Sequence, residues 1–187
     1  TLGFWLNNAG ATVSSGNFDW TVTGTSDTAR GLVRVSSGTF NLGAAGGNNL
    51  VTGNFSDIVI EGGAFIIGGA LTRNAAADDV HFNMSVGTLT VGGSGAPANY
   101  SFRMEAAASF TMSGGTIVVR RSGGGNGYQN LATTASVIGG TLQIGDGSTP
   151  AASTMGINSS APTWDLTVNN TNSPTARLVT NSLTVKH

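Results

Sequence analysis

The chain has 187 residues, a net charge of −1 and only 9% charged residues, against about 25% in ordinary soluble domains. Its eight Lys and Arg residues are dispersed, which argues against a phosphate-binding surface and hence against a nucleic-acid partner. The absence of cysteine excludes a disulfide framework or thiolate metal site, and no apolar run approaches the roughly 20 residues of a membrane span.

Six segments share a turn glycine that has apolar residues at positions −3, +2 and +4 relative to it. These glycines are 22 to 28 residues apart: Gly16, Gly38, Gly63, Gly87, Gly115 and Gly140. The alternation at +2 and +4 is typical of a strand, and the glycine allows a tight corner. Each unit therefore predicts a strand, a glycine turn, a second strand and a loop. Two degenerate copies follow at residues 164–168 and 181–185.

A unit of about 25 residues cannot bury its own apolar positions, whereas stacked units place like positions in continuous ladders. The predicted fold is an all-β, single-stranded parallel β-helix of about seven to eight rungs, formed by residues 1–187 as one domain. Val13 and Trp20 are expected to begin two flanking ladders. The central core ladder is predicted to be Phe18, Phe40, Phe65, Leu89, Ile117 and Leu142.

Other all-β folds fit the spacing less well. A β-sandwich predicts turn signals every 8–12 residues, and a propeller blade requires about 40–50 residues. The apolar N-terminal residues Leu2, Phe4, Trp5 and Leu6 are expected to pack on a preceding rung. Loops are predicted at residues 44–49, 73–79, 94–99 and 121–130, with Tyr100 and Tyr128 as their aromatic side chains.

The stretch Gly139-Gly140-Thr141-Leu142-Gln143-Ile144-Gly145 resembles the GGTLxIG-type strand repeats of autotransporter passenger domains. Residues 164–170 and 181–185 are similar to repeats in large secreted surface proteins of gliding and biofilm-forming bacteria. The resemblance implies a parallel β-helix at the cell surface that serves in adhesion or as a stalk, without catalytic residues. Such proteins carry a membrane-anchoring barrel or sorting tail, so we expect this chain to be a segment of a longer one.

The sequence contains few candidates for catalytic or metal-binding residues. Asp57 and His81 both precede their turn glycine by six residues, which predicts an outward-facing pair on neighbouring rungs. Asp78, Asp79 and Asp146 could supply calcium oxygens, but no calcium-solenoid repeat is present. The nine acids occupy different unit positions, which disfavours a two-carboxylate glycosidase or lyase. We therefore predict no catalytic, cofactor-binding or metal-binding residues.

Two further features concern the outward positions. An outward threonine array is typical of ice-binding solenoids, but here only Thr88 and Thr90 form a Thr-x-Thr rung; the threonines at +1 are Thr39, Thr88, Thr116 and Thr141. Outward apolar residues, if they cluster on one wall, would mark a face that is covered by a loop or by another chain; they are Leu32, Val59, Ile66 and Val118.

The expected function is that of a non-catalytic structural component of an extracellular bacterial surface fibre, stalk or adhesin. Its expected partners are copies of itself or neighbouring segments of the same long chain, and we expect neither nucleic-acid binding nor membrane insertion. One alternative is an adhesin module that binds cell-surface glycan or host protein, and a remote one is a polysaccharide-degrading β-helix enzyme. No cofactor is expected.

Overall fold

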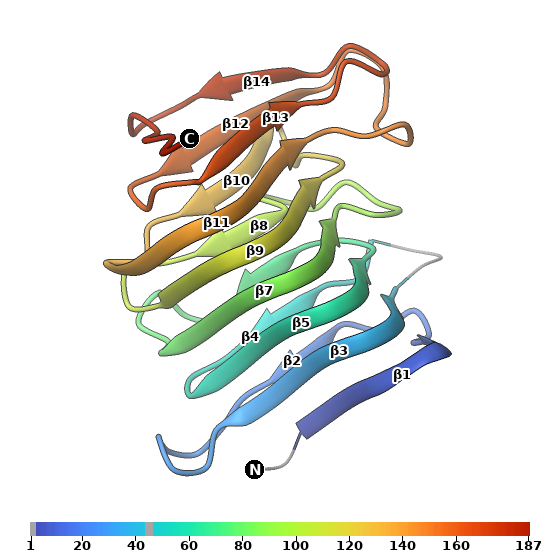
Figure 1. Cartoon of the computed structure of the whole chain (residues 1–187), viewed down its shortest axis with the longest axis vertical. Helices are drawn as coiled ribbons and strands as arrows, with labels where there is room; N and C mark the ends of the chain where they lie inside the picture. The colour runs from blue at the N-terminus through green and yellow to red at the C-terminus, as the bar shows by residue number, and fades with distance from the viewer. Residues whose placement is uncertain (1–2, 44–46) are drawn as a thin grey trace.

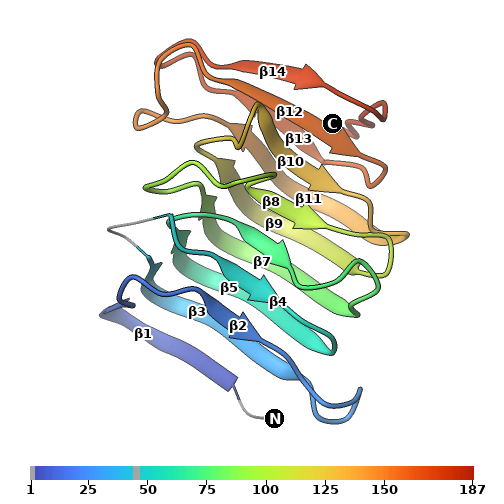
Figure 2. The same ribbon diagram turned by 180° about the vertical axis from the view of Figure 1, so that it is seen from behind.

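The computed structural model describes residues 3–43 and 47–187, which form an all-β parallel solenoid of about seven turns (Figure 1). The prediction of a parallel β-helix is therefore confirmed. Each turn contributes one strand to one sheet and one strand to a second sheet behind it, as the view from the back shows (Figure 2). The first of these is the longer strand in every turn except the last, where both have four residues. Leu2 and residues 44–46 of the first predicted loop lie outside the described residues.

The long sheet contains the odd-numbered strands: β1 (Gly3–Ser14), β3 (Gly31–Leu42), β5 (Ser56–Ile67), β7 (Val80–Val91), β9 (Ser109–Val119), β11 (Thr134–Ile144) and β13 (Asp165–Val168). The short sheet contains the even-numbered strands: β2 (Trp20–Val22), β4 (Leu50–Thr52), β6 (Leu71–Arg73), β8 (Phe102–Met104), β10 (Asn126–Asn130), β12 (Thr154–Ser159) and β14 (Thr175–Leu178). Successive strands lie in opposite sheets, so the chain winds once around the core for each pair of strands.

The two predicted strands around each glycine form one long strand that bends at the glycine. Gly38, Gly63, Gly87, Gly115 and Gly140 all have positive φ angles, between 66° and 92°. At Gly63 an added Cβ would lie 2.3 Å from the carbonyl oxygen of Gly38 on the turn below. Glycine is thus required there both for the left-handed backbone and for the close approach of neighbouring turns.

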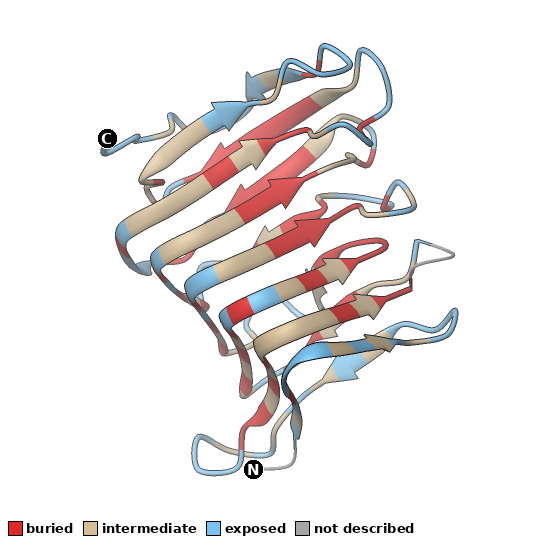
Figure 3. Cartoon of the chain, turned by 45° about the vertical axis from the view of Figure 1, so that its right-hand side comes forward, coloured by how far each residue is buried: buried red, intermediate tan, exposed pale blue. Residues whose placement is uncertain are grey.

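Inward residues of the long strands stack in register from turn to turn. Phe40, Phe65, Leu89, Ile117 and Leu142 are paired in sequence along one ladder and are fully or almost fully buried. Phe40 and Phe65 stack with ring centroids 4.9 Å apart, and Phe82 and Phe110 stack at 5.2 Å. The strands in the middle of the solenoid are the most buried, whereas β1 and β14 are mostly exposed (Figure 3).

The short sheet supplies the opposite wall of the core. Its main ladder pairs residues from every turn: Trp20, Leu50, Leu71, Phe102, Tyr128, Ile157 and Leu178. The predicted loop at residues 121–130 is wrong in its second half, because these residues form β10. Tyr128 is buried and stacks on Phe102 at 4.9 Å, and Asn130 donates a hydrogen bond to its hydroxyl. Burial therefore raises the pKa of Tyr128 above its ordinary value.

The predicted first unit is wrong. Phe18 is 76% exposed, and Gly16 is not among the glycines with positive φ. The bend of β1 is made by residues 8–11, which together lie opposite Gly38, so that Val13 rather than Phe18 pairs with Phe40. Trp20 consequently belongs to the short sheet, where it pairs with Leu50.

The last degenerate copy does not form a complete turn. Among the described residues, Val185 makes an isolated parallel bridge with Thr163, and the backbone N–H of His187 donates to the carbonyl of Trp164. The copy at residues 164–168, in contrast, takes its place in the stack, since Leu166 pairs with Leu142. The molecule thus has seven turns and the beginning of an eighth.

The bend predicts a graded response to alanine substitution. Gly63→Ala combines a φ of +66° with a backbone clash, so it should lower the free energy of unfolding by more than the about 1–2 kcal/mol of a left-handed backbone alone. Gly124→Ala has a φ of +55° but nothing within 4 Å of the new Cβ, and should cost only that amount. Gly147→Ala, with neither constraint, should be close to neutral. Urea unfolding followed by circular dichroism measures all three, and equal losses at Gly63 and Gly124 would contradict the packing of neighbouring turns at the bend.

Candidate functional site

The largest cluster of charged side chains is organised by Arg30, whose side chain is only 9% exposed. Its Nε donates to Asp57 at 2.6 Å, and its Nη1 donates to Asp79 at 2.8 Å and to Asp27 at 3.0 Å. Its Nη2 donates to the carbonyls of Ser56 and Asp79. The hydrogen bond from Arg30 lowers the pKa of Asp79 below its ordinary value. This single guanidinium therefore ties the start of β3 to the two following turns.

The predicted neighbourhood of Asp57 and His81 is confirmed. The two residues are direct partners between β5 and β7, and His81 Nδ1 lies 3.2 Å from Asp57 Oδ1. His81 Nε2 lies 3.3 Å from Asp79 Oδ1. Both carboxylates also bind Arg30, so the pair is part of a larger ion-pair cluster. This cluster joins three successive turns at one corner of the solenoid, which favours a structural role for Asp57 and His81.

Further ion pairs also link successive turns. Glu105 accepts hydrogen bonds from Arg73 and Arg103, both at 2.8 Å. Arg120 binds Asp146 through its Nε at 2.8 Å. Burial by itself would raise the pKa of Asp146, but hydrogen bonds from Arg120 and the Ser148 backbone lower it overall.

The structure does not bring the predicted calcium candidates together. Asp79 lies in the Arg30 cluster, Asp146 lies with Arg120, and Asp78 accepts a hydrogen bond from the backbone N–H of Ala75 within its own loop. Within residues 3–43 and 47–187, no group of three or more His, Cys, Asp or Glu side chains is arranged to hold a metal ion.

The outward threonines do not form an open array. Thr88, Thr116 and Thr141 are in register, but Ala64 interrupts the column below them, and Thr90 is buried. The four outward apolar residues behave differently from one another. Val118 is buried, whereas Leu32, Val59 and Ile66 are half-buried, and an added Cβ at Gly93 in the loop after β7 would lie 3.0 Å from Ile66. The four residues lie in three separate columns of the sheet, and the loop after β7 packs near one of them, Ile66.

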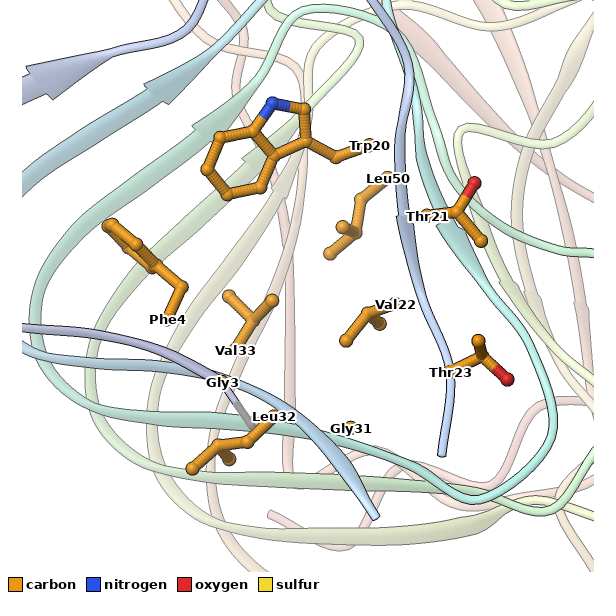
Figure 4. A pocket seen from close by; sticks show the side chains of 10 residues that line it. All are labelled: Gly3, Phe4, Trp20, Thr21, Val22, Thr23, Gly31, Leu32, Val33 and Leu50. Carbon is orange, nitrogen blue, oxygen red and sulfur yellow. The ribbon is translucent and has the colours of Figure 1, made fainter. Parts of the chain in front are cut away.

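The N-terminal end of the solenoid is open between its two sheets. A cavity of about 270 Å³ lies there, with Phe4 and Val33 on one wall and Trp20, Val22 and Leu50 on the other (Figure 4). Phe4 packs on Phe40 with ring centroids 4.4 Å apart, so it forms the last layer of the aromatic stack. The side chains of Thr21 and Thr23 point away from the cavity (Figure 4). The end of the core is thus apolar and reachable from outside.

The C-terminal end also exposes apolar side chains. Val168, Leu178, Val179 and Val185 are between 42% and 55% exposed. Val168 and Leu178 are the terminal members of ladders that are buried further down the stack, since they pair with Ile144 and Ile157. Both ends of the solenoid therefore present core positions that a further turn would cover.

Sequence reasoning missed one group on the outer wall of the long sheet. Trp5, which was expected to pack on a preceding rung, is 58% exposed on this wall, and its Nε1 donates to Ser36 at 2.9 Å. Arg34 lies 5.0 Å from the centre of the Trp5 ring and donates to Glu61 Oε2 at 2.7 and 2.9 Å. The hydrogen bond from Arg34 lowers the pKa of Glu61. The sequence does contain an indication of this group: Arg34 and Glu61 have opposite charges and are 27 residues apart, which is about one turn of the repeat.

Comparisons with protein-family models, with curated proteins and with solved structures find no match. No helix in the described part of the chain has the length and apolarity that a bilayer crossing requires.

The Arg30 cluster predicts a change in the pH dependence of stability. Arg30→Met should lower the free energy of unfolding at pH 7 by about 3 kcal/mol, because partly buried carboxylates lose their cation. In the wild type, the low pKa of Asp79 gives stability that is lost as the pH falls below about 4. In the variant, Asp79 loses the cation that lowers its pKa, so this part of the stability should be absent and the profile should be flatter below about pH 4. Urea midpoints as a function of pH measure both proteins, with exposed Arg177→Met as the control; parallel profiles would contradict this role of Arg30.

Proposed function

We propose that this chain is a non-catalytic structural segment of an extracellular bacterial fibre, stalk or adhesin. The observation that carries the proposal is that both ends of the solenoid are open. The N-terminal end has an apolar cavity between β1 and β2, and the C-terminal end exposes the last residues of the core ladders. A further solenoid turn has the shape, the polarity and the strand direction to cover either end.

Continuity of strand pairing supports this proposal. Val185 already pairs in parallel with Thr163, and the N–H groups of Lys186 and His187 donate to the carbonyls of Thr163 and Trp164. His187 Nδ1 also lies 2.8 Å from Asp165 Oδ1. If this pairing continued in the same register, further residues would pair with Leu166 and Val168 at the free edge of β13. The partner would be a neighbouring segment of the same long chain or another copy.

The use of charge supports a mechanical role. Most arginines bind carboxylates on another turn, as Arg30, Arg34, Arg73 and Arg120 do. These pairs join turns that are already joined by backbone hydrogen bonds and by core ladders. A stack that is held by backbone hydrogen bonds and core ladders, and at several turns also by ion pairs, resists bending and extension, as a spacer must. The extracellular location rests on the low charge and on the resemblance to surface-protein repeats.

The proposal predicts end-to-end association. The purified chain should form oligomers or filaments along the solenoid axis as its concentration rises, because burying the open ends removes apolar surface from water. Sedimentation velocity measures the association, and electron microscopy shows its direction.

A matched pair of variants locates the contact. Val168→Glu places a charge on the C-terminal end, where Val168 is 44% exposed, and should abolish association. Val86→Glu places the same charge on the side wall, where Val86 is 59% exposed, and should leave association unchanged. The opposite pattern would indicate lateral assembly. Monomers at every concentration would refute self-assembly and leave neighbouring segments of the same chain as the only partners of this proposal.

A further inference from the structure

The outer wall of the long sheet carries a mainly polar strip that begins at an aromatic residue and that Val59 and Val86 interrupt. One outward column passes from Trp5 on β1 through directly paired residues on the next turns: Arg34, Val59, Asn83, Thr111 and Ser136. Beside it, near the bends, Ser36, Glu61, Ser85 and Ser113 lie on four successive long strands, although a register shift pairs Glu61 directly with Val86. The first column runs along the solenoid axis with one residue on each of six turns, about 4.8 Å apart.

The strip is hollowed in its middle. A groove of about 150 Å³ crosses β5, β7 and β9, and its polar lining residues are Glu61, Asn83, Ser85, Thr111 and Ser113. Val59, Ile60 and Met84 line the rest of it. The groove thus offers hydroxyl, amide and carboxylate groups beside the half-buried side chain of Val59, whereas the side chains of Ile60 and Met84 belong to the core. Together with the exposed ring of Trp5, this places polar groups and apolar surface on one wall, which is the combination that binds a ligand with both hydroxyl groups and C–H faces.

Hydrogen bonds connect Trp5 to this groove and fix its carboxylate. Trp5 Nε1 donates to Ser36 Oγ at 2.9 Å, and Ser36 Oγ donates to Glu61 Oε2 at 3.1 Å. Arg34 binds the same oxygen, so all of these contacts engage Oε2 and none engages Oε1. Arg34 also neutralises the charge of Glu61. The strip therefore holds an oriented acceptor beside an exposed indole, without a net charge of its own.

These properties favour a neutral carbohydrate chain over other ligands. A nucleic acid would require a cluster of basic side chains, and the one arginine of the strip is already paired. A stable protein partner would require a large interface with a desolvated apolar centre, whereas this groove is shallow and bordered by hydroxyl groups. An extended sugar chain presents C–H faces to an indole and hydroxyl pairs to a carboxylate. Its units advance by a distance comparable to one solenoid turn.

We propose that this strip binds an extended, neutral, β-1,4-linked polysaccharide along the solenoid axis, with Trp5 as the stacking platform and Glu61 as the hydroxyl acceptor. This site is independent of the open ends, so the stalk would carry a glycan-binding wall along its side.

The test uses the purified chain and two hexasaccharide probes, cellohexaose and its N-acetylated counterpart chitohexaose. The chain has three tryptophans, so its NMR spectrum contains three indole N–H signals. Binding of either probe should shift the Trp5 signal and leave those of Trp20 and Trp164 in place. The corresponding disaccharides should bind more weakly, because the strip spans several turns. Shifts at Trp20 or Trp164 alone, or no shift at millimolar hexasaccharide, would overturn the proposal.

Variants separate binding from folding. Trp5→Ala and Glu61→Gln should each weaken binding about tenfold or more in titration calorimetry. Phe18→Ala removes another exposed aromatic side chain, away from the strip, and should leave affinity unchanged. Unfolding midpoints establish that each variant is folded at the temperature of the titration. Unchanged affinity in both folded strip variants, or an equal loss in Phe18→Ala, would refute the assignment.

Discussion

In-register parallel pairing between successive turns is the constraint on which the other features of this molecule depend. It brings residues about 25 positions apart into direct contact, so each side chain meets its counterpart on the next turn. The aromatic stack of Phe40 on Phe65, the close approach of Gly63 to Gly38 and the ion pair of Arg34 with Glu61 all follow from it. A shift of one residue would turn inward side chains outward along a whole strand.

This constraint also explains where the charged residues lie. In this solenoid, several oppositely charged residues are about one turn apart in the sequence. Arg30 therefore pairs with Asp57, and Arg120 pairs with Asp146. Exposed pairs of this kind add little to the stability of the fold. They favour one order of the turns, because each arginine lies opposite a carboxylate on a neighbouring turn, and the paired charges neutralise each other. The polar strip from Trp5 to Thr111 is consistent with this pattern, because its only charged residues neutralise each other.

Much of the fold could be predicted from the sequence because the bend glycine and its inward neighbours recur in five successive turns, from Gly38 to Gly140. The short sheet could not, since three-residue strands such as Leu50–Thr52 are too short to show alternation. Gly16 and Phe18 were misassigned because residues 8–11 replace the single bend glycine of later turns. The sequence of the strand containing Tyr128 resembles a glycine-rich loop. In the structure, the buried hydroxyl of Tyr128 accepts the hydrogen bond that Asn130 donates. The Arg30 cluster could have been predicted only from opposite charges that are about one turn of the repeat apart in the sequence.

The solenoid is closed in its middle and open at both ends, and we propose that further turns add at these ends. Hydrogen–deuterium exchange at two protein concentrations tests it most directly. The account predicts strong, concentration-independent protection of β5, β7 and β9, and weak protection of β1, β2, β13 and β14 that increases at the higher concentration. Uniform protection along the chain, or a concentration-dependent increase confined to the side wall of the middle turns, would contradict it.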